Sequence, residues 1–233
     1  MIKRGMGHIE VILAFVLFVG FLLFGLYFFN PLNNNRLIDS SLFYAMDEIT
    51  KNTSSELLTY AVVINSSVAS DAVALQLDRN GIEGSGVRVE KSDGESVNSR
   101  YDNNNLVFER QGNFFFVFFG DFSYNNSVVS GSPAVLSAPS NFSISSSDTR
   151  KVLSERGAIY LKEKYAGNYE GLKTQFNLPR RVDFSFSLKL GNESISASQN
   201  IPEGIEVFSD SKRVEVIRTD GTRTFADIIV AVW

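Results

Sequence analysis

The chain has 233 residues, of which 44% are apolar and 21% charged, with a formal net charge of −4. It contains no cysteine and one histidine, His8, so disulfides, thiolate or histidine metal sites, and Ser-His-Asp or Cys-His catalysis are excluded from the remainder. The absence of a basic cluster argues against nucleic-acid binding. The length suits one sizeable domain plus an additional N-terminal segment.

The first predicted element is an apolar helix. No charged side chain occurs from Val11 to Phe29, and such a run rises ~1.5 Å per residue as a helix, about the ~30 Å of a bilayer core. We therefore expect a transmembrane helix at 6–30, with membrane lipid as a partner. Lys3 and Arg4 precede it, so the positive-inside rule predicts a single-pass protein with a cytoplasmic N-terminus and an extracellular C-terminal domain at the cell surface.

The N-terminus resembles the short leader of type IV pilin-like proteins, including archaeal class III signal peptides. The resemblance covers about residues 3–30 and is carried by Lys3, Arg4, Gly5, Met6 and Glu10. It implies that a prepilin peptidase cleaves after Gly5 and removes a leader at 1–5. Met6 then becomes the new N-terminus and Glu10 the fifth residue of the mature chain.

Glu10 has two interpretations. The resemblance implies that its carboxylate pairs with the free amino group of a neighbouring subunit and sets the axial stagger of helices in an assembly. A charge at the edge of hydrocarbon is costly unless it is paired. Alternatively, Glu10 lies among lipid headgroups, favoured by the positive end of the helix dipole, in a plain signal anchor.

A stalk helix is expected next, within 31–56. Pro31 interrupts the first helix, and a second runs from about Arg36 to Asn52. Its apolar residues recur at spacings of three and four and form one stripe, which consists of Ile38, Leu42, Ala45, Met46 and Ile49.

The rest, 57–233, is predicted to be β-rich. Alternating and β-branched runs predict strands at Thr59–Ile64, Ala72–Leu77, Gly86–Lys91, Glu95–Tyr101, Asn105–Glu109, Asn113–Phe122, Val182–Leu190, Ile205–Phe208, Val214–Arg218 and Thr224–Trp233. The run from Phe114 to Phe119 is apolar on both faces and predicts a central strand covered on each side.

Between these groups of strands we expect a loop and helices. Residues from Asn125 to Ser147 are rich in Ser, Asn, Gly and Pro and predict a long exposed loop. A helix capped by Ser147 or Asp148 should run to about Tyr165, with a shorter one at Tyr169–Phe176. The predicted class is α+β: an N-terminal transmembrane helix followed by a mostly antiparallel β domain with one or two packed helices.

No catalytic, cofactor or metal site is predicted. Gly81 to Gly86 has its glycines in the wrong order for a phosphate-binding loop and reads as a turn. Paired carboxylates that could hydrolyse glycosides are not marked by any pattern. Five Asn-x-Ser/Thr sequons are candidate N-glycosylation sites, at Asn52, Asn65, Asn125, Asn141 and Asn192.

The favoured function is a non-enzymatic, pilin-like subunit of a type IV pilus-related surface filament or assembly machine. Its size favours a minor or accessory subunit, with a prepilin peptidase and other pilin-like subunits as partners. The alternative is an uncleaved, single-pass membrane-anchored extracellular binding or adhesion domain.

Overall fold

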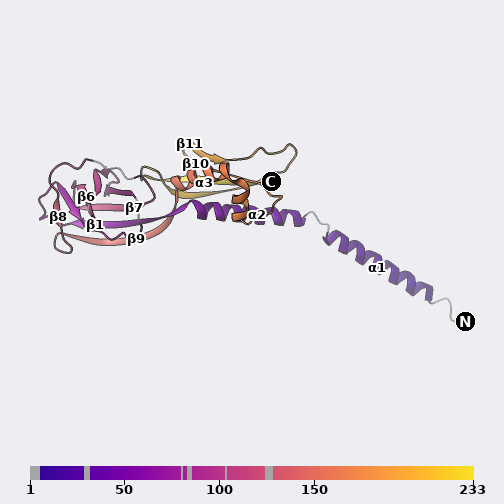
Figure 1. Cartoon of the computed structure of the whole chain (residues 1–233). Helices are drawn as coiled ribbons and strands as arrows, with labels where there is room; N and C mark the ends of the chain where they lie inside the picture. The colour runs from indigo at the N-terminus through magenta and orange to yellow at the C-terminus, as the bar shows by residue number, and fades with distance from the viewer. Residues whose placement is uncertain (1–5, 29–31, 80, 83–85, 103, 124–127) are drawn as a thin grey trace.

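The computed structural model describes residues 6–28, 32–79, 81–82, 86–102, 104–123 and 128–233. The molecule is elongated (Figure 1): helix α1 (Met6–Phe28) projects at one end, helix α2 (Leu32–Thr53) follows, and the strands extend away from it. The remaining helices are α3 (Glu155–Gly167) and α4 (Tyr169–Gln175).

Two sheets contain the described strands. The first has the order β11-β10-β13-β12-β9-β1-β7-β3-β4 and the second the order β5-β6-β2-β8. The strands are β1 (Ser54–Ile64), β2 (Ala72–Leu75), β3 (Gly86–Lys91), β4 (Ser96–Val97), β5 (Ser99–Asp102), β6 (Asn105–Glu109), β7 (Phe114–Gly120), β8 (Ala134–Leu136), β9 (Phe142–Ser154), β10 (Phe184–Leu190), β11 (Glu193–Ala197), β12 (Phe208–Ile217) and β13 (Arg223–Val232).

The end of the molecule far from α1 is a sandwich half, in which β1, β3, β4 and β7 of the large sheet face the small sheet. Alternate residues of each strand point into its core, as the period of two requires. The phenylalanine-rich strand β7 is central, between β1 and β3, as predicted. Phe115 and Phe119 are fully buried in this core, and Phe118 is buried on the opposite face.

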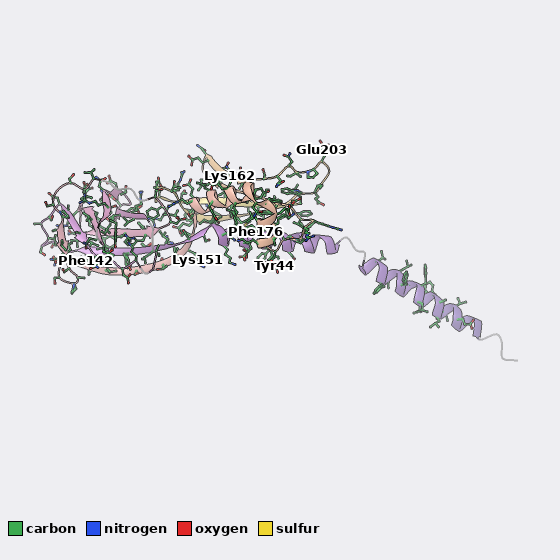
Figure 2. All side chains as sticks on the ribbon, in the orientation of Figure 1. Tyr44, Phe142, Lys151, Lys162, Phe176 and Glu203 are labelled. Carbon is green, nitrogen blue, oxygen red and sulfur yellow. The ribbon has the colours of Figure 1, made fainter. Side chains whose placement is uncertain are left out.

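The other end is a helix-covered half, made of β10–β13 with α2, α3 and α4 packed on one face. The predicted apolar stripe of α2 packs against this core: Ala45 and Ile49 are fully buried, and Met46 is partly buried. In β10, Phe184, Phe186, Leu188 and Leu190 are buried, so the predicted alternation is confirmed. Figure 2 places Phe176 and Tyr44 in this half and Phe142 at the far end of the sandwich half.

The predicted boundary between loop and helix is wrong: the loop does not reach Ser147 and the helix does not start at Ser147 or Asp148, although the helix predicted to end near Tyr165 is present as α3. Residues 142–154 form β9, which pairs with β1 from Ile64↔Phe142 to Ser54↔Leu153. This ladder overrides the weak strand propensity of a serine-rich, charged segment. Helix α3 starts at Glu155, where the Ser154 hydroxyl accepts a hydrogen bond from the Gly157 amide at 3.1 Å. The short helix near Tyr169 is confirmed as α4.

The predicted fold class also needs correction. Of the residues that the structure describes together with their side chains, 42% lie in strands and 26% in helices, so this part of the protein is mostly β. Among the residues that the structure describes, no helix combines the length and the hydropathy needed to cross a membrane. The predicted transmembrane helix and single-pass location are therefore corrected.

A polar cluster fastens α4 to the start of β10. The Lys173 ammonium, almost fully buried, lies 2.8 Å from an Asp183 carboxylate oxygen and donates to the Arg180 carbonyl at 3.1 Å. The Tyr169 hydroxyl donates to the same Asp183 oxygen at 2.8 Å. Burial alone would raise the pKa of Asp183, but the hydrogen bonds from Lys173 and Tyr169 outweigh it and hold that pKa below its usual value.

The pKa values of the neighbouring tyrosines shift in the opposite direction, upward. Burial raises the pKa of Tyr165 to about 12, and it raises the pKa of Tyr169 as well, because a phenolate would be desolvated there. The Tyr165 hydroxyl donates to the Phe184 carbonyl at 2.5 Å. Both phenols therefore stay neutral hydrogen-bond donors at ordinary pH.

The cluster predicts a pH-dependent loss of stability for Asp183→Asn. A carboxylate with a lowered folded-state pKa stabilises the fold above its unfolded pKa of about 3.9, and that stabilisation is lost as pH falls below this range. We expect a loss of roughly 1–2 kcal/mol at pH 7, since the partly exposed carboxylate is screened by water. The difference in the free energy of unfolding between Asp183→Asn and wild type should shrink as the pH approaches 2.5.

Urea unfolding of the full chain at both pH values measures this, with Asp47→Asn, an exposed carboxylate on α2, as the control. A loss of stability that is the same at pH 7 and pH 2.5 would contradict the assignment to Asp183 ionisation.

Candidate functional site

The apolar surface of α1 is exposed on every side. Twelve of its large apolar side chains, between Val11 and Leu26, retain 47% to 75% of their accessible surface. A monomeric protein rarely exposes a contiguous apolar surface of this extent, and such surfaces mark interaction sites. A Cβ added at Gly20 or Gly25 meets nothing within 4 Å, so no other described part of the chain approaches the helix closely there.

Glu10 is the one charged residue between positions 10 and 26, and its side chain is exposed. It lies near the start of α1, at the end of the molecule opposite the sandwich half (Figure 1). Of the predicted processing residues, Lys3, Arg4 and Gly5 lie outside the described residues, and Met6 is the first residue of α1.

Helix α2 connects this apolar helix to the body. Its inner face is fixed on the β10–β13 sheet, whereas Phe43 and Tyr44 on its outer face are 69% and 58% exposed. Their rings contact each other edge to face, with centroids 6.2 Å apart. At the other end, Gly157 of α3 lies so close to Thr53 that an added Cβ would lie 2.8 Å from the Thr53 carbonyl oxygen. The base of α2 is therefore held rigidly.

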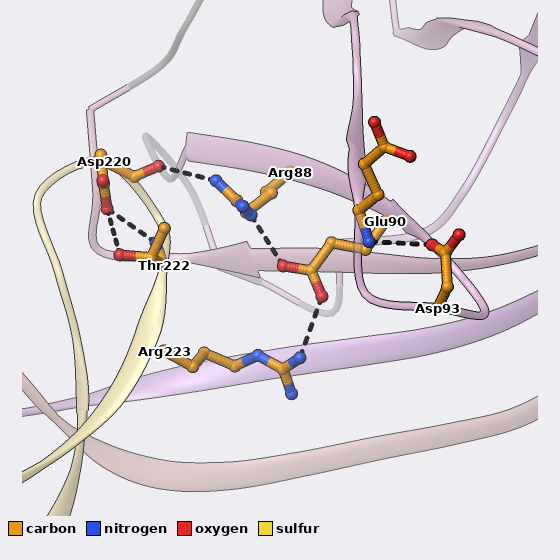
Figure 3. A network of polar contacts seen from close by, with 7 residues as sticks. Arg88, Glu90, Asp93, Asp220, Thr222 and Arg223 are labelled. Atoms are coloured by element: carbon orange, nitrogen blue, oxygen red, sulfur yellow. Dashed lines mark hydrogen bonds and ion pairs between the residues drawn. The ribbon is translucent and has the colours of Figure 1, made fainter.

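The two halves of the body meet at a buried carboxylate, Glu90 (Figure 3). One oxygen accepts a hydrogen bond from Arg88 Nε at 2.8 Å, and the other accepts one from Arg223 Nη2 at 3.0 Å. Glu90 and Arg88 belong to β3 in the sandwich half, whereas Arg223 begins β13. The Arg223 guanidinium also lies over the Phe118 ring, 4.1 Å from its centroid.

The turn that joins β12 to β13 is held at the same junction. The Thr219 amide donates to Glu155 Oε2 at 2.8 Å, and the Ser123 amide donates to the Thr219 carbonyl at 2.8 Å. Gly221 has a φ of 79°, and an added Cβ would meet the Phe122 ring at 2.8 Å, so only glycine fits this turn. These contacts orient the sandwich half relative to the helix-covered half.

A cleft of about 490 Å³ lies where β9 and β12 separate. The two strands pair only at Val216↔Leu153 and Ile217↔Ser154, and residues at the end of α2 line the cleft between them. Its charged lining is balanced and comprises Asp47, Lys51, Glu56, Lys151, Lys212 and Glu215. No group of three or more potential metal ligands occurs among the described residues, so the cleft offers no metal centre there.

The sequons lie at different places. Asn52 is in the last turn of α2, Asn65 follows β1, Asn141 precedes β9, and Asn192 lies in the β10–β11 turn. Asn125 falls outside the described residues. Residues 83–85 of the predicted turn from Gly81 to Gly86 also lie outside the described residues. A Cβ added at Gly86 would lie 2.5 Å from the Phe122 ring, so close packing explains the glycine at this position.

Sequence reasoning missed the Glu90 and Lys173 clusters. Glu90 and Arg223 are 133 positions apart, so no local spacing relates them. Comparison with protein-family models, with curated proteins and with solved structures finds no match.

The junction predicts a large effect for Glu90→Gln. Removing the charge leaves Arg88 and Arg223 facing a neutral amide in a buried site, which should lower the free energy of unfolding by about 3 kcal/mol. The matched control is Glu56→Gln on β1, whose side chain is exposed and whose substitution should change stability by about 0.5 kcal/mol or less. Urea unfolding of both variants checks this, and equal stabilities would show that Glu90 does not hold the junction.

Proposed function

We propose that the chain is a non-enzymatic, pilin-like subunit of a type IV pilus-related surface filament or assembly machine, of the minor or accessory kind. It assembles through α1. The observation that carries the proposal is the apolar surface of α1, exposed on every side. An amphipathic helix would use one face against its own domain, whereas a helix that is apolar all round needs partners on several sides.

The energetics favour association through this helix. Each large apolar side chain contributes ~1.5–3 kcal/mol when it is fully removed from water. Covering the exposed side chains of α1 therefore supplies on the order of 10 kcal/mol or more per subunit before the cost of ordering is subtracted. The partners are the α1 helices of other pilin-like subunits.

The N-terminal residues support the same function. Lys3, Arg4 and Gly5 match the leader pattern, and Met6, which follows the proposed cleavage site, lies in α1. A prepilin peptidase that cleaves there would release a chain whose helix begins at its N-terminus. Glu10 would then be available to a neighbouring subunit's amino group.

The mature N-terminus tests the processing step. We expect intact mass and N-terminal peptide analysis of protein from its native host to identify Met6 as the first residue. Gly5→Leu should retain the leader, because the peptidase would lose the small residue before its cleavage site. An N-terminus at Met1 in wild-type protein would contradict the proposal and favour a binding domain that does not assemble.

Glu10 tests the assembly step. Glu10→Ala should leave the fold and the processing unchanged but reduce the assembled fraction about tenfold, as expected for the loss of an interaction of about 1.4 kcal/mol. Asp39→Ala, which removes an exposed carboxylate from α2, is the control and should assemble as wild type does. Sedimentation and electron microscopy of the assembled fraction measure the effect. Normal filaments from Glu10→Ala would exclude the pairing role.

A further inference from the structure

Three of the four described sequons have their hydroxyl residue inside a β-ladder. Ser54, two residues after Asn52, pairs with Leu153. Ser143, two residues after Asn141, pairs with Val63, and Ser194, two residues after Asn192, pairs with Lys189. A transferase must bind the acceptor asparagine and this hydroxyl together, so each of these segments would have to leave its ladder first.

The Asn52 carboxamide is also fully engaged within the fold. Its Nδ2 donates to the Glu48 carbonyl at 2.7 Å and to Glu48 Oε2 at 3.2 Å. Its Oδ1 accepts from Gln175 Nε2 at 3.0 Å. Both hydrogens of the amide nitrogen are therefore used, which makes it a poor nucleophile in the folded chain.

Asn65 differs from Asn52 in both respects, and it differs from Asn141 and Asn192 in the position of its hydroxyl residue. It is exposed in the turn after β1, and Ser67 lies outside any ladder. The Ser67 amide donates to Asn65 Oδ1 at 3.1 Å, so the turn already places the hydroxyl residue beside the carboxamide. Among the described residues, Asn65 Nδ2 has no hydrogen-bond partner and is free to react.

We propose that Asn65 is the acceptor of an N-linked glycan on the folded protein and that Asn52 is not modified. The donor is a lipid-pyrophosphate-linked oligosaccharide. Asn65 Nδ2 forms a bond to the anomeric carbon of the first sugar, while the bond from that carbon to the pyrophosphate oxygen breaks. The lipid pyrophosphate leaves with the electron pair, and the amide nitrogen gives one proton to a base of the transferase.

The position of Asn65 leaves the assembly helix clear. The Asn65 amide donates to the Asn141 carbonyl at 2.8 Å, next to Phe142. Figure 2 shows Phe142 at the end of the sandwich half farthest from α1. A glycan there covers the outermost end of the molecule and does not obstruct the apolar surface of α1.

The test uses the folded full chain, a purified oligosaccharyltransferase and a lipid-pyrophosphate-linked oligosaccharide. Peptides spanning each of the four sequons serve as unfolded references, with an enzyme first shown to modify the Asn65 peptide. We expect Asn65 occupancy in the folded chain to exceed that of Asn52, Asn141 and Asn192 by at least about tenfold, because their ladders must open first. The four peptides should differ much less.

Two serine variants serve as a matched pair. Ser67→Ala should abolish modification of Asn65, whereas Ser66→Ala, one position away, should retain it. Site-resolved mass spectrometry measures the occupancy in each case. The proposal is overturned if the folded chain leaves Asn65 unmodified while its peptide reacts, or if Asn52 in the folded chain is occupied to the same extent as Asn65. Neither outcome bears on assembly through α1.

Discussion

The pairing of β1 with β9 is the constraint on which the rest of the body depends. The two strands pair from Ser54↔Leu153 to Ile64↔Phe142 and run through both halves of the molecule. Toward one end, β1 also pairs with β7, which brings the phenylalanine-rich strand into the sandwich core. Toward the other, β9 leads directly into α3 and meets β12. Because α2 ends where β1 begins, the same ladder aligns the helical part of the chain with the sandwich half.

A second constraint, the polar contacts of Glu90 and Glu155, holds the two halves in one orientation. The strands β9 and β12 share only two residue pairs, so backbone pairing alone would allow the halves to bend at this point. Glu90, which accepts from both Arg88 and Arg223, joins β3 to β13 across the junction, and Glu155 holds the turn between β12 and β13. Buried carboxylates of this kind are costly to desolvate unless they are well paired. Their geometry therefore favours one arrangement of the halves over others.

The apolar helix α1 contrasts with the body. The body buries its apolar side chains in two main cores, whereas α1 leaves its own exposed. The proposed function rests on this contrast: the body buries most of its own apolar surface, whereas α1 is the part that is proposed to bind other subunits. Modification at Asn65 would lie at the opposite end, so assembly and modification would use separate surfaces.

The sequence by itself determined the features that depend on local pattern. The helices near Ile38 and Tyr169, the central position of Phe115 and Phe119, and the alternating strand at β10 all follow from periodicity and composition, because burial of one face imposes a period that can be read directly. The tertiary structure decided the rest. Residues 142–154 became a strand because β1 offers them an unpaired edge, and Glu90 became the junction because folding brings Arg223 to it across 133 positions. The tertiary structure also separated Asn65 from the other described sequons, because their hydroxyl residues pair with a neighbouring strand and Ser67 does not.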